Sequence, residues 1–293
     1  MRASIAHEKI RRLEIVTKKL MDGPLVGDDL SAHRGYGVEL DQLREYQFGD
    51  DVRFIDFKSS CRLNKMMVKE CLEERNRKII IALDISSSSD YGSHVQRFEI
   101  MQDCAAILTL AAHHARDSVG LLFFSDILEC TIEPANTVRH VHWLLKKIYE
   151  TPVGVHKKTD MNVLLQHVAR NWYKDAIVFV ISDFIVDDIK QSLRATGSRV
   201  DLVAVRCFDE MERVLPRVGY ITLDDIEDSQ NVLINMSTNT SAARAVQTRL
   251  DTQNELFACE GIDVVDIAYS TDICAKLIDF FKRRMIHTTI RYG

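Results

Sequence analysis

The chain has 293 residues, 46% of them hydrophobic, and a formal net charge of −5 at pH 7. A chain of this length and composition buries a substantial core, which indicates one large domain, alone or with a modest extension. The acidic balance disfavours nucleic acid as a partner, because polyanion-binding proteins normally show a basic surplus.

The sequence indicates a cytoplasmic protein without a membrane span. Its seven cysteines include no C-x-x-C pair, which is typical of reduced, mostly buried thiols. The N-terminal stretch MRASIAHEKIRRLEIVTKKL is charged throughout and lacks the apolar segment of a secretory signal. The best candidate for a span, residues 104–115, contains two histidines and is shorter than the roughly 18 uncharged residues required.

The first part of the chain shows little regular patterning. A charged, helix-compatible segment covers about residues 3–20 and is broken by the Gly-Pro pair at residues 23–24. Residues 30–77 are mixed and polar, with few periodic signals. We therefore expect residues 1–76 to form an N-terminal extension.

From residue 77 onward, apolar runs of strand length alternate with amphipathic helical patterns. Strands are expected at residues 78–83, 118–124, 127–132, 176–182, 200–205 and 262–270. Helices are expected near residues 97–116, 137–149, 163–172, 187–195, 243–257 and 273–284. Turn signals predict hairpins at residues 125–126 and within residues 219–237. This alternation predicts an α/β fold over residues 77–293: a doubly wound, mostly parallel sheet with helices on both faces.

One strand-like run is followed at once by an acid and four serines, in the stretch ALDISSSSDYG at residues 82–92. In open α/β sheets, ligands bind outside the carboxyl ends of the strands, where the strand order reverses. Asp84 lies at such an end, and Asp183 follows the run AIVFVIS in the same way. If these two strands are neighbours, two carboxylates stand side by side, and a proton or a cation must offset their repulsion.

Hydroxyl groups accompany these acids. Asp84-x-Ser86-x-Ser88 offers a carboxylate and two hydroxyls at alternate positions, and Thr159 offers another hydroxyl from the loop KKTD. Such hard oxygen donors suit Mg²⁺ or Mn²⁺ and not zinc. Together with Asp183, the set resembles the metal-ion-dependent adhesion site of von Willebrand factor A domains. The alternative is that the serines cap a helix and Asp84 is a satisfied buried acid.

The segment before the serines resembles a bacterial family catalogued as domain of unknown function 58. The motifs are GYGVEL, LREYQFGDDVRFID and the basic step FKSSCR, which leads into the strand. The matching residues are Gly35, Gly37, Glu39, Leu43, Arg44, Tyr46, Gly49, Asp50, Asp51, Arg53, Ile55 and Asp56. The resemblance runs from about residue 23 to residue 284. Among the departures, Phe57 replaces the usual tryptophan, and Lys157 and Lys158 replace glycines before Thr159.

The resemblance implies a von Willebrand A-like domain with an N-terminal extension. Family members are often encoded beside MoxR-type AAA+ ATPases and other von Willebrand A proteins, and are thought to act with them as chaperone-like or maturation factors. We therefore expect a non-enzymatic interaction module. In it, the two aspartates, two serines and threonine bind one Mg²⁺, with Mn²⁺ or Ca²⁺ as alternatives, some through water. A partner carboxylate completes the coordination.

Two other functions stay open. The chain is a structural scaffold with a non-functional metal site, which the lysines before Thr159 favour, or it is a Mg²⁺-dependent phosphohydrolase with Asp84 as nucleophile. The second option lacks the acid/base aspartate two residues later, where Ser86 stands. The sequence shows no Walker A loop, G-x-S-x-G elbow or G-x-G-x-x-G fingerprint.

The segment Gly49-Asp50-Asp51 also has two interpretations. It is a partner-contacting or second acidic site, or it is a turn in which the glycine sets the backbone and Arg53 pairs locally. Acidic turns are common on exposed loops, so the turn is our expectation.

Overall fold

The computed structural model describes residues 13, 34–35, 39–47, 50–72, 77–90, 96–154, 157–171, 173, 176–186, 189–208, 220–224, 231–235, 240–268 and 270–292. The chain divides into two compact units, one of residues 21–76 and one of residues 77–293 together with residues 1–20. The helix expected over residues 3–20 lies outside the described residues except at Leu13, which is helical and packs against the core of the larger unit.

The smaller unit contains a three-stranded antiparallel sheet that was not predicted from the sequence. Its strands, in spatial order, are β1 (Arg34–Gly35), β3 (Met67–Leu72) and β2 (Glu39–Glu45). Between β2 and β3 the chain forms the 3₁₀ helix η1 (Val52–Phe54) and the helix α2 (Phe57–Leu63). Only a few apolar side chains of this unit are buried in the described part, among them Ile55 and Val68, so no strong periodic pattern marks its strands.

The larger unit is built on a six-stranded sheet. In spatial order its strands are β11 (Asp263–Ala268), β8 (Asp201–Phe208), β7 (Ile177–Ser182), β4 (Lys78–Asp84), β5 (Ser118–Phe124) and β6 (Leu128–Ala135). The neighbours from β11 to β5 pair in parallel, and β6 returns antiparallel to β5 through the expected hairpin. Chain order runs outward from β4 in one direction and from β7 in the other. The sheet therefore reverses its order between β4 and β7.

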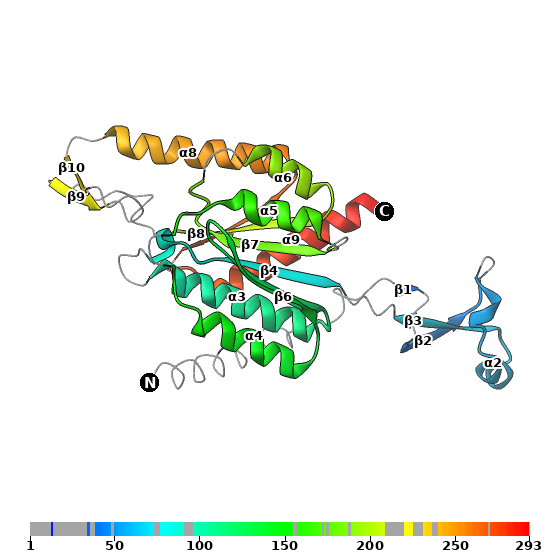
Figure 1. The fold of residues 1–293 in the computed structure, drawn as a ribbon. Helices are drawn as coiled ribbons and strands as arrows, with labels where there is room; N and C mark the ends of the chain where they lie inside the picture. Colours follow the sequence, from blue (N-terminus) through cyan, green and yellow to red (C-terminus); the bar gives the residue numbers. More distant parts are fainter. Residues whose placement is uncertain are drawn as a thin grey trace. The chain divides into compact units, whose positions relative to one another are not determined.

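Helices cover both faces of this sheet (Figure 1). They are α3 (Arg97–His114), α4 (Val138–Glu150), α5 (Met161–Arg170), α6 (Lys190–Gly197), α8 (Thr240–Cys259) and α9 (Ile273–Tyr292). Side chains of α3, α4 and α9 share one core cluster with Ile79 and Ile81, whereas those of α5, α6 and α8 share another with Ile80. The split follows from the period of two along a strand. Within the described part of the chain, none of the helices is long and apolar enough to cross a membrane.

The fold class expected from the sequence is confirmed. The larger unit has the doubly wound, mostly parallel sheet with helices on both faces that a von Willebrand A-like domain requires. The expected second hairpin is also present, formed by β9 (Tyr220–Asp224) and β10 (Asn231–Asn235).

Candidate metal centre

Asp84 and Asp183 stand at the point where the sheet reverses its strand order. Asp84 is the last residue of β4, and Asp183 directly follows β7. The two strands are hydrogen-bonded neighbours in parallel register, with Leu83 opposite Ile181. The two carboxylates therefore share one edge of the sheet, which is the usual place for a ligand in this architecture.

Three hydroxyl groups converge beside Asp84. Ser86 Oγ and Ser88 Oγ share a hydrogen bond of 3.0 Å, and Thr159 Oγ1 donates one of 2.7 Å to Ser86 Oγ. Two oxygen ligands at about 2.1 Å from Mg²⁺, in neighbouring octahedral positions, stand about 3.0 Å apart. The spacing of these hydroxyls thus fits neighbouring ligands of one small, hard cation.

Asp84 is fully buried and hydrogen-bonded through both oxygens. Its Oδ1 accepts the Ser86 N–H at 2.9 Å, and its Oδ2 accepts the Ser182 hydroxyl at 2.7 Å. Burial first, and then the charge of Asp183, raise the pKa of the Asp84 carboxyl to about 7. A cation nearby stabilises the charged form and so opposes both causes.

A buried arginine also belongs to the site and was not predicted from the sequence. Arg97, the first residue of α3, is 3% exposed, and its guanidinium pairs with Asp183 Oδ2 and donates to the Ser88 carbonyl at 3.3 Å. A cation in the first turn of a helix is unfavourable with the helix dipole. An arginine at this position, next to the buried Phe98, therefore indicates that an acidic side chain lies close by.

The backbone turn that positions Asp183 is held by tertiary contacts. The next residue, Phe184, is buried and has a φ of 56°, in the left-handed region that costs most side chains about 1–2 kcal/mol. Its N–H donates to Ser182 Oγ at 3.1 Å, its carbonyl accepts Gln253 Nε2 at 2.6 Å, and its ring packs edge-on against Phe257. These contacts offset the strain and fix the direction in which the chain leaves β7.

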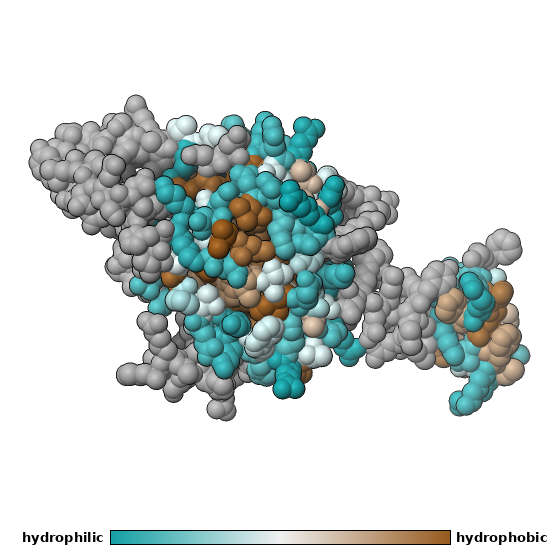
Figure 2. All heavy atoms as spheres, viewed as in Figure 1, coloured by the Kyte–Doolittle hydropathy of each residue, from teal (hydrophilic) through white to brown (hydrophobic). Residues whose placement is uncertain are grey.

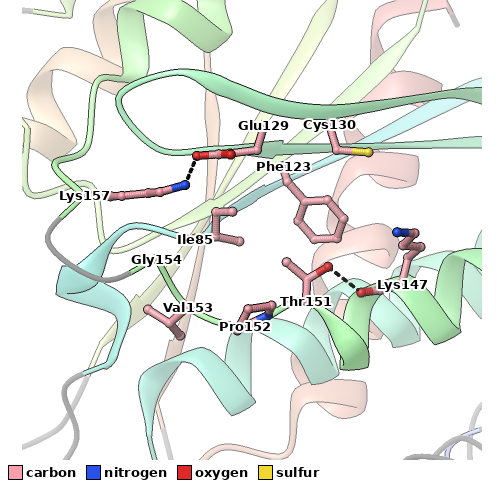
Figure 3. Close-up of a pocket in the computed structure, with 10 residues that line it drawn as sticks. All are labelled: Ile85, Phe123, Glu129, Cys130, Lys147, Thr151, Pro152, Val153, Gly154 and Lys157. Atoms are coloured by element: carbon pink, nitrogen blue, oxygen red, sulfur yellow. Dashed lines mark hydrogen bonds and ion pairs between the residues drawn. The ribbon is translucent and has the colours of Figure 1, made fainter.

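The loop that carries Thr159 docks on the serine loop although it lacks the usual glycines. The Lys157 carbonyl accepts hydrogen bonds from both the N–H and the hydroxyl of Ser87, at 3.0 and 2.7 Å. The Lys157 ammonium pairs with Glu129 (Figure 3). The departure from the family pattern therefore coexists with a Thr159 hydroxyl placed against Ser86.

A cavity of about 260 Å³ lies beside these loops. Ile85, which separates Asp84 from Ser86 in the sequence, lines it together with Phe123 and Thr151. Figure 3 shows the aromatic ring of Phe123 among apolar side chains, and the Lys157–Glu129 ion pair on one side of them. A mainly apolar recess thus adjoins the hydroxyl cluster.

The structure brings the five residues predicted as metal ligands into one cluster. Among the residues that it describes, no three His, Cys, Asp or Glu side chains are grouped to hold a metal. The donors here are two carboxylates and three hydroxyls, a set that fits a hard cation such as Mg²⁺ and does not fit zinc.

Curated relatives and solved structures resemble this chain. The chain is 28% identical over 284 residues to the uncharacterized protein Rv1480 of Mycobacterium tuberculosis, with 94% of this chain and 88% of that protein covered. The same values hold for the uncharacterized protein Mb1516 of Mycobacterium bovis. The crystal structure of the conserved hypothetical protein BatB from Bacteroides thetaiotaomicron aligns with a TM-score of 0.48 at 13% identity, over 72% of this chain and 99% of that one. The VWA domain of SpRpn10 aligns with a TM-score of 0.40 at 12% identity, over 69% and 93% of the two chains.

One family model matches most of the chain. The model described as "Protein of unknown function DUF58" matches residues 42–255, a range that includes all five predicted ligands and the GDD segment. The chain therefore belongs to the DUF58 family.

Proposed function

We propose that this protein is a divalent-metal-dependent protein-interaction module. The observation that carries the proposal is that the Ser88 and Thr159 hydroxyls both hydrogen-bond the Ser86 hydroxyl, next to the buried Asp84, at the spacing of ligands around one small cation. Mg²⁺ is the first choice, with Mn²⁺ and Ca²⁺ as alternatives. The ion, when bound, supplies an open coordination position for an oxygen of the partner.

The charges of the site favour a carboxylate from the partner. Asp84 and Asp183 contribute two negative charges, and the buried Arg97 contributes one positive charge. With both carboxyls ionised in the metal-bound state, a divalent ion brings the sum to +1. An excess charge in a buried site is unfavourable unless it is paired, so the side chain of an aspartate or glutamate neutralises the loaded site.

Apolar groups around the site favour a protein as the partner. Ile185 is 43% exposed and donates its N–H to Asp183, and Ile127, at the β5–β6 hairpin, is 55% exposed. The cavity lined by Ile85 and Phe123 provides a recess next to the serine loop. A partner segment that carries a carboxylate next to an apolar side chain fits this combination.

The partner is, on the family resemblance, a MoxR-type AAA+ ATPase or another von Willebrand A protein. The resemblance also supports a role in chaperone-like assembly or maturation. This part of the proposal is tested by mixing the purified chain with the MoxR-type ATPase of its own genome, with and without Mg²⁺. A complex that forms only with Mg²⁺ supports it, and sedimentation as separate proteins in both conditions contradicts it.

The two alternatives are weaker on the geometry. Asp84 has no exposed surface and accepts hydrogen bonds at both oxygens, whereas a nucleophile must reach its substrate. Ser86, at the acid/base position of a phosphohydrolase, engages Ser88 and Thr159 and is a poor proton donor. A scaffold with a non-functional site leaves the buried acid pair with Arg97 as its one paired cation among the residues that the structure describes.

Capture of binding proteins on the immobilised chain tests the proposal. We expect proteins that bind in Mg²⁺, are released by EDTA and are lost with Asp84→Ala. The matched control is Asp117→Ala, because Asp117 is also buried but precedes β5, at the opposite end of the parallel strands. Circular dichroism checks that both variants fold. Capture that is unchanged by EDTA and is retained by the Asp84→Ala variant contradicts the proposal.

A further inference from the structure

The acids of the GDD segment are engaged within the smaller unit. Asp50 accepts two hydrogen bonds of 2.7 Å from the Arg44 guanidinium, and Asp51 pairs with Arg53 at 2.6 Å and caps η1. These partners lower the pKa of both carboxyls. The expected local pairing of Arg53 is confirmed, whereas Gly49 lies outside the described residues. Both carboxylates are thus engaged by arginines of their own unit, as the interpretation as a turn expects.

The residues that follow this segment, 52–66, display large apolar side chains to solvent. Val52, Phe57, Leu63 and Met66 are 63%, 69%, 57% and 50% exposed. They make up half of the eight large apolar side chains that are exposed in the described part of the chain, and they fall within fifteen residues. Figure 2 shows apolar surface gathered on this unit beside hydrophilic side chains. An exposed apolar patch on a soluble protein is typical of an interaction site.

Basic side chains are interspersed with these apolar groups. Residues 57–69 contain Lys58, Arg62, Lys65 and Lys69 and no acid. Lys65 pairs with Glu45 of β2, while Lys58 and Arg62 lie exposed on α2. Phenylalanine, methionine and arginine are also residue types that protein interfaces favour.

We propose that residues 52–69 form a docking surface for an acidic, apolar segment of a partner protein, separate from the metal centre. The apolar side chains provide the area to be buried, and the exposed Lys58 and Arg62 of α2 favour an acidic partner. A protein segment fits better than a lipid or nucleic acid surface, because the exposed phenylalanine, methionine and arginine are residue types that protein interfaces favour.

Two designed peptides test the proposal on the full chain. One is an amphipathic helix of about 18 residues with leucine on one face and glutamate elsewhere, and the other carries lysine in place of glutamate. Fluorescence anisotropy should show binding of the glutamate peptide only, unchanged by EDTA and by Asp84→Ala, which separates this surface from the metal centre. Phe57→Ser with Leu63→Ser should weaken binding about ten-fold or more.

Charge reversal gives a second readout that does not depend on apolar truncation. The double variant Lys58→Glu with Arg62→Glu should no longer bind the glutamate peptide and should bind the lysine peptide instead. The control is Val138→Ser on the larger unit, because Val138 is about as exposed as Leu63, at 59% and 57%. This substitution should leave the binding of both peptides unchanged. The proposal is overturned if the glutamate peptide does not bind, or if it binds all variants alike. It is also overturned if the Phe57/Leu63 variant loses only self-association in sedimentation, or only binding to vesicles that contain phosphatidylserine.

Discussion

Metal binding at the proposed centre should displace a proton from Asp84. The pKa of this buried carboxyl is about 7, so about 0.9 of the molecules hold the proton at pH 6 and about 0.1 at pH 8. Because a metal ligand must be deprotonated, Mg²⁺ binding should release about 0.9 proton per site at pH 6 and about 0.1 at pH 8. The apparent Kd should therefore be about ten-fold weaker at pH 6 than at pH 8.

Calorimetry in two buffers with different ionisation enthalpies measures this proton release. Asp117→Asn is the control, because burial also raises the pKa of Asp117, to about 6, but that group lies at the far end of the strands. The Asp117→Asn substitution should leave the number of protons released on Mg²⁺ binding unchanged. Equal binding enthalpies in both buffers at pH 6 would refute the assignment of the proton to Asp84.

The same shift has a consequence for stability without metal. The ordinary pKa of an aspartate is 3.8, so between about pH 4 and pH 7 the folded protein holds a proton that the unfolded chain has released. The contribution of Asp84 to the free energy of unfolding is therefore fully present below about pH 4 and is lost as the pH rises through 7. Mg²⁺ should flatten this slope.

Two further substitutions have defined outcomes. Arg97→Met removes the only cation paired with Asp183 among the described residues, so the metal-free variant should lose about 3 kcal/mol of unfolding free energy. Its Mg²⁺ affinity, measured by calorimetry, should nevertheless rise about ten-fold or more, and an unchanged affinity would contradict the charge argument. Gly120→Ala in β5 places a Cβ 2.8 Å from the Ile132 carbonyl oxygen of β6, so urea unfolding should show a loss of about 1–3 kcal/mol. A variant as stable as the wild type would show that this hairpin shifts at little cost.

The parts predicted from the sequence are those with local signals. The runs before Asp84 and Asp183 are strands buried on both faces, which read as continuous apolar segments that end in an acid. Their pairing then follows from how parallel sheets are wound, so two carboxylates at one edge could be foreseen. The sheet of residues 21–76 gave no such signal, because few of the apolar side chains that the structure describes there are buried, which leaves no strong pattern.

The missed parts of the site depend on distant contacts. Arg97 meets Asp183 across 86 positions of sequence, and Ser182 meets Asp84 across 98. The left-handed backbone of Phe184 is held by residues of α8, so no property of its own sequence neighbourhood indicates it. Local patterns thus located the five residues predicted as ligands, whereas the groups that set their charge and direction required the folded chain.

Calorimetric titration with Mg²⁺ and Mn²⁺ tests the central claim most directly. The comparison is between the wild type and Thr159→Val, which removes one hydroxyl and keeps the shape of the side chain. Ser89→Ala is the control, because Ser89 is a buried serine of the same run whose hydroxyl has no hydrogen-bond partner in the described part of the chain. The account predicts saturable one-site binding in the wild type and in Ser89→Ala, and about ten-fold or greater loss in Thr159→Val. Binding that is absent from the wild type, or equal in all three proteins, would contradict a metal centre built from these hydroxyls.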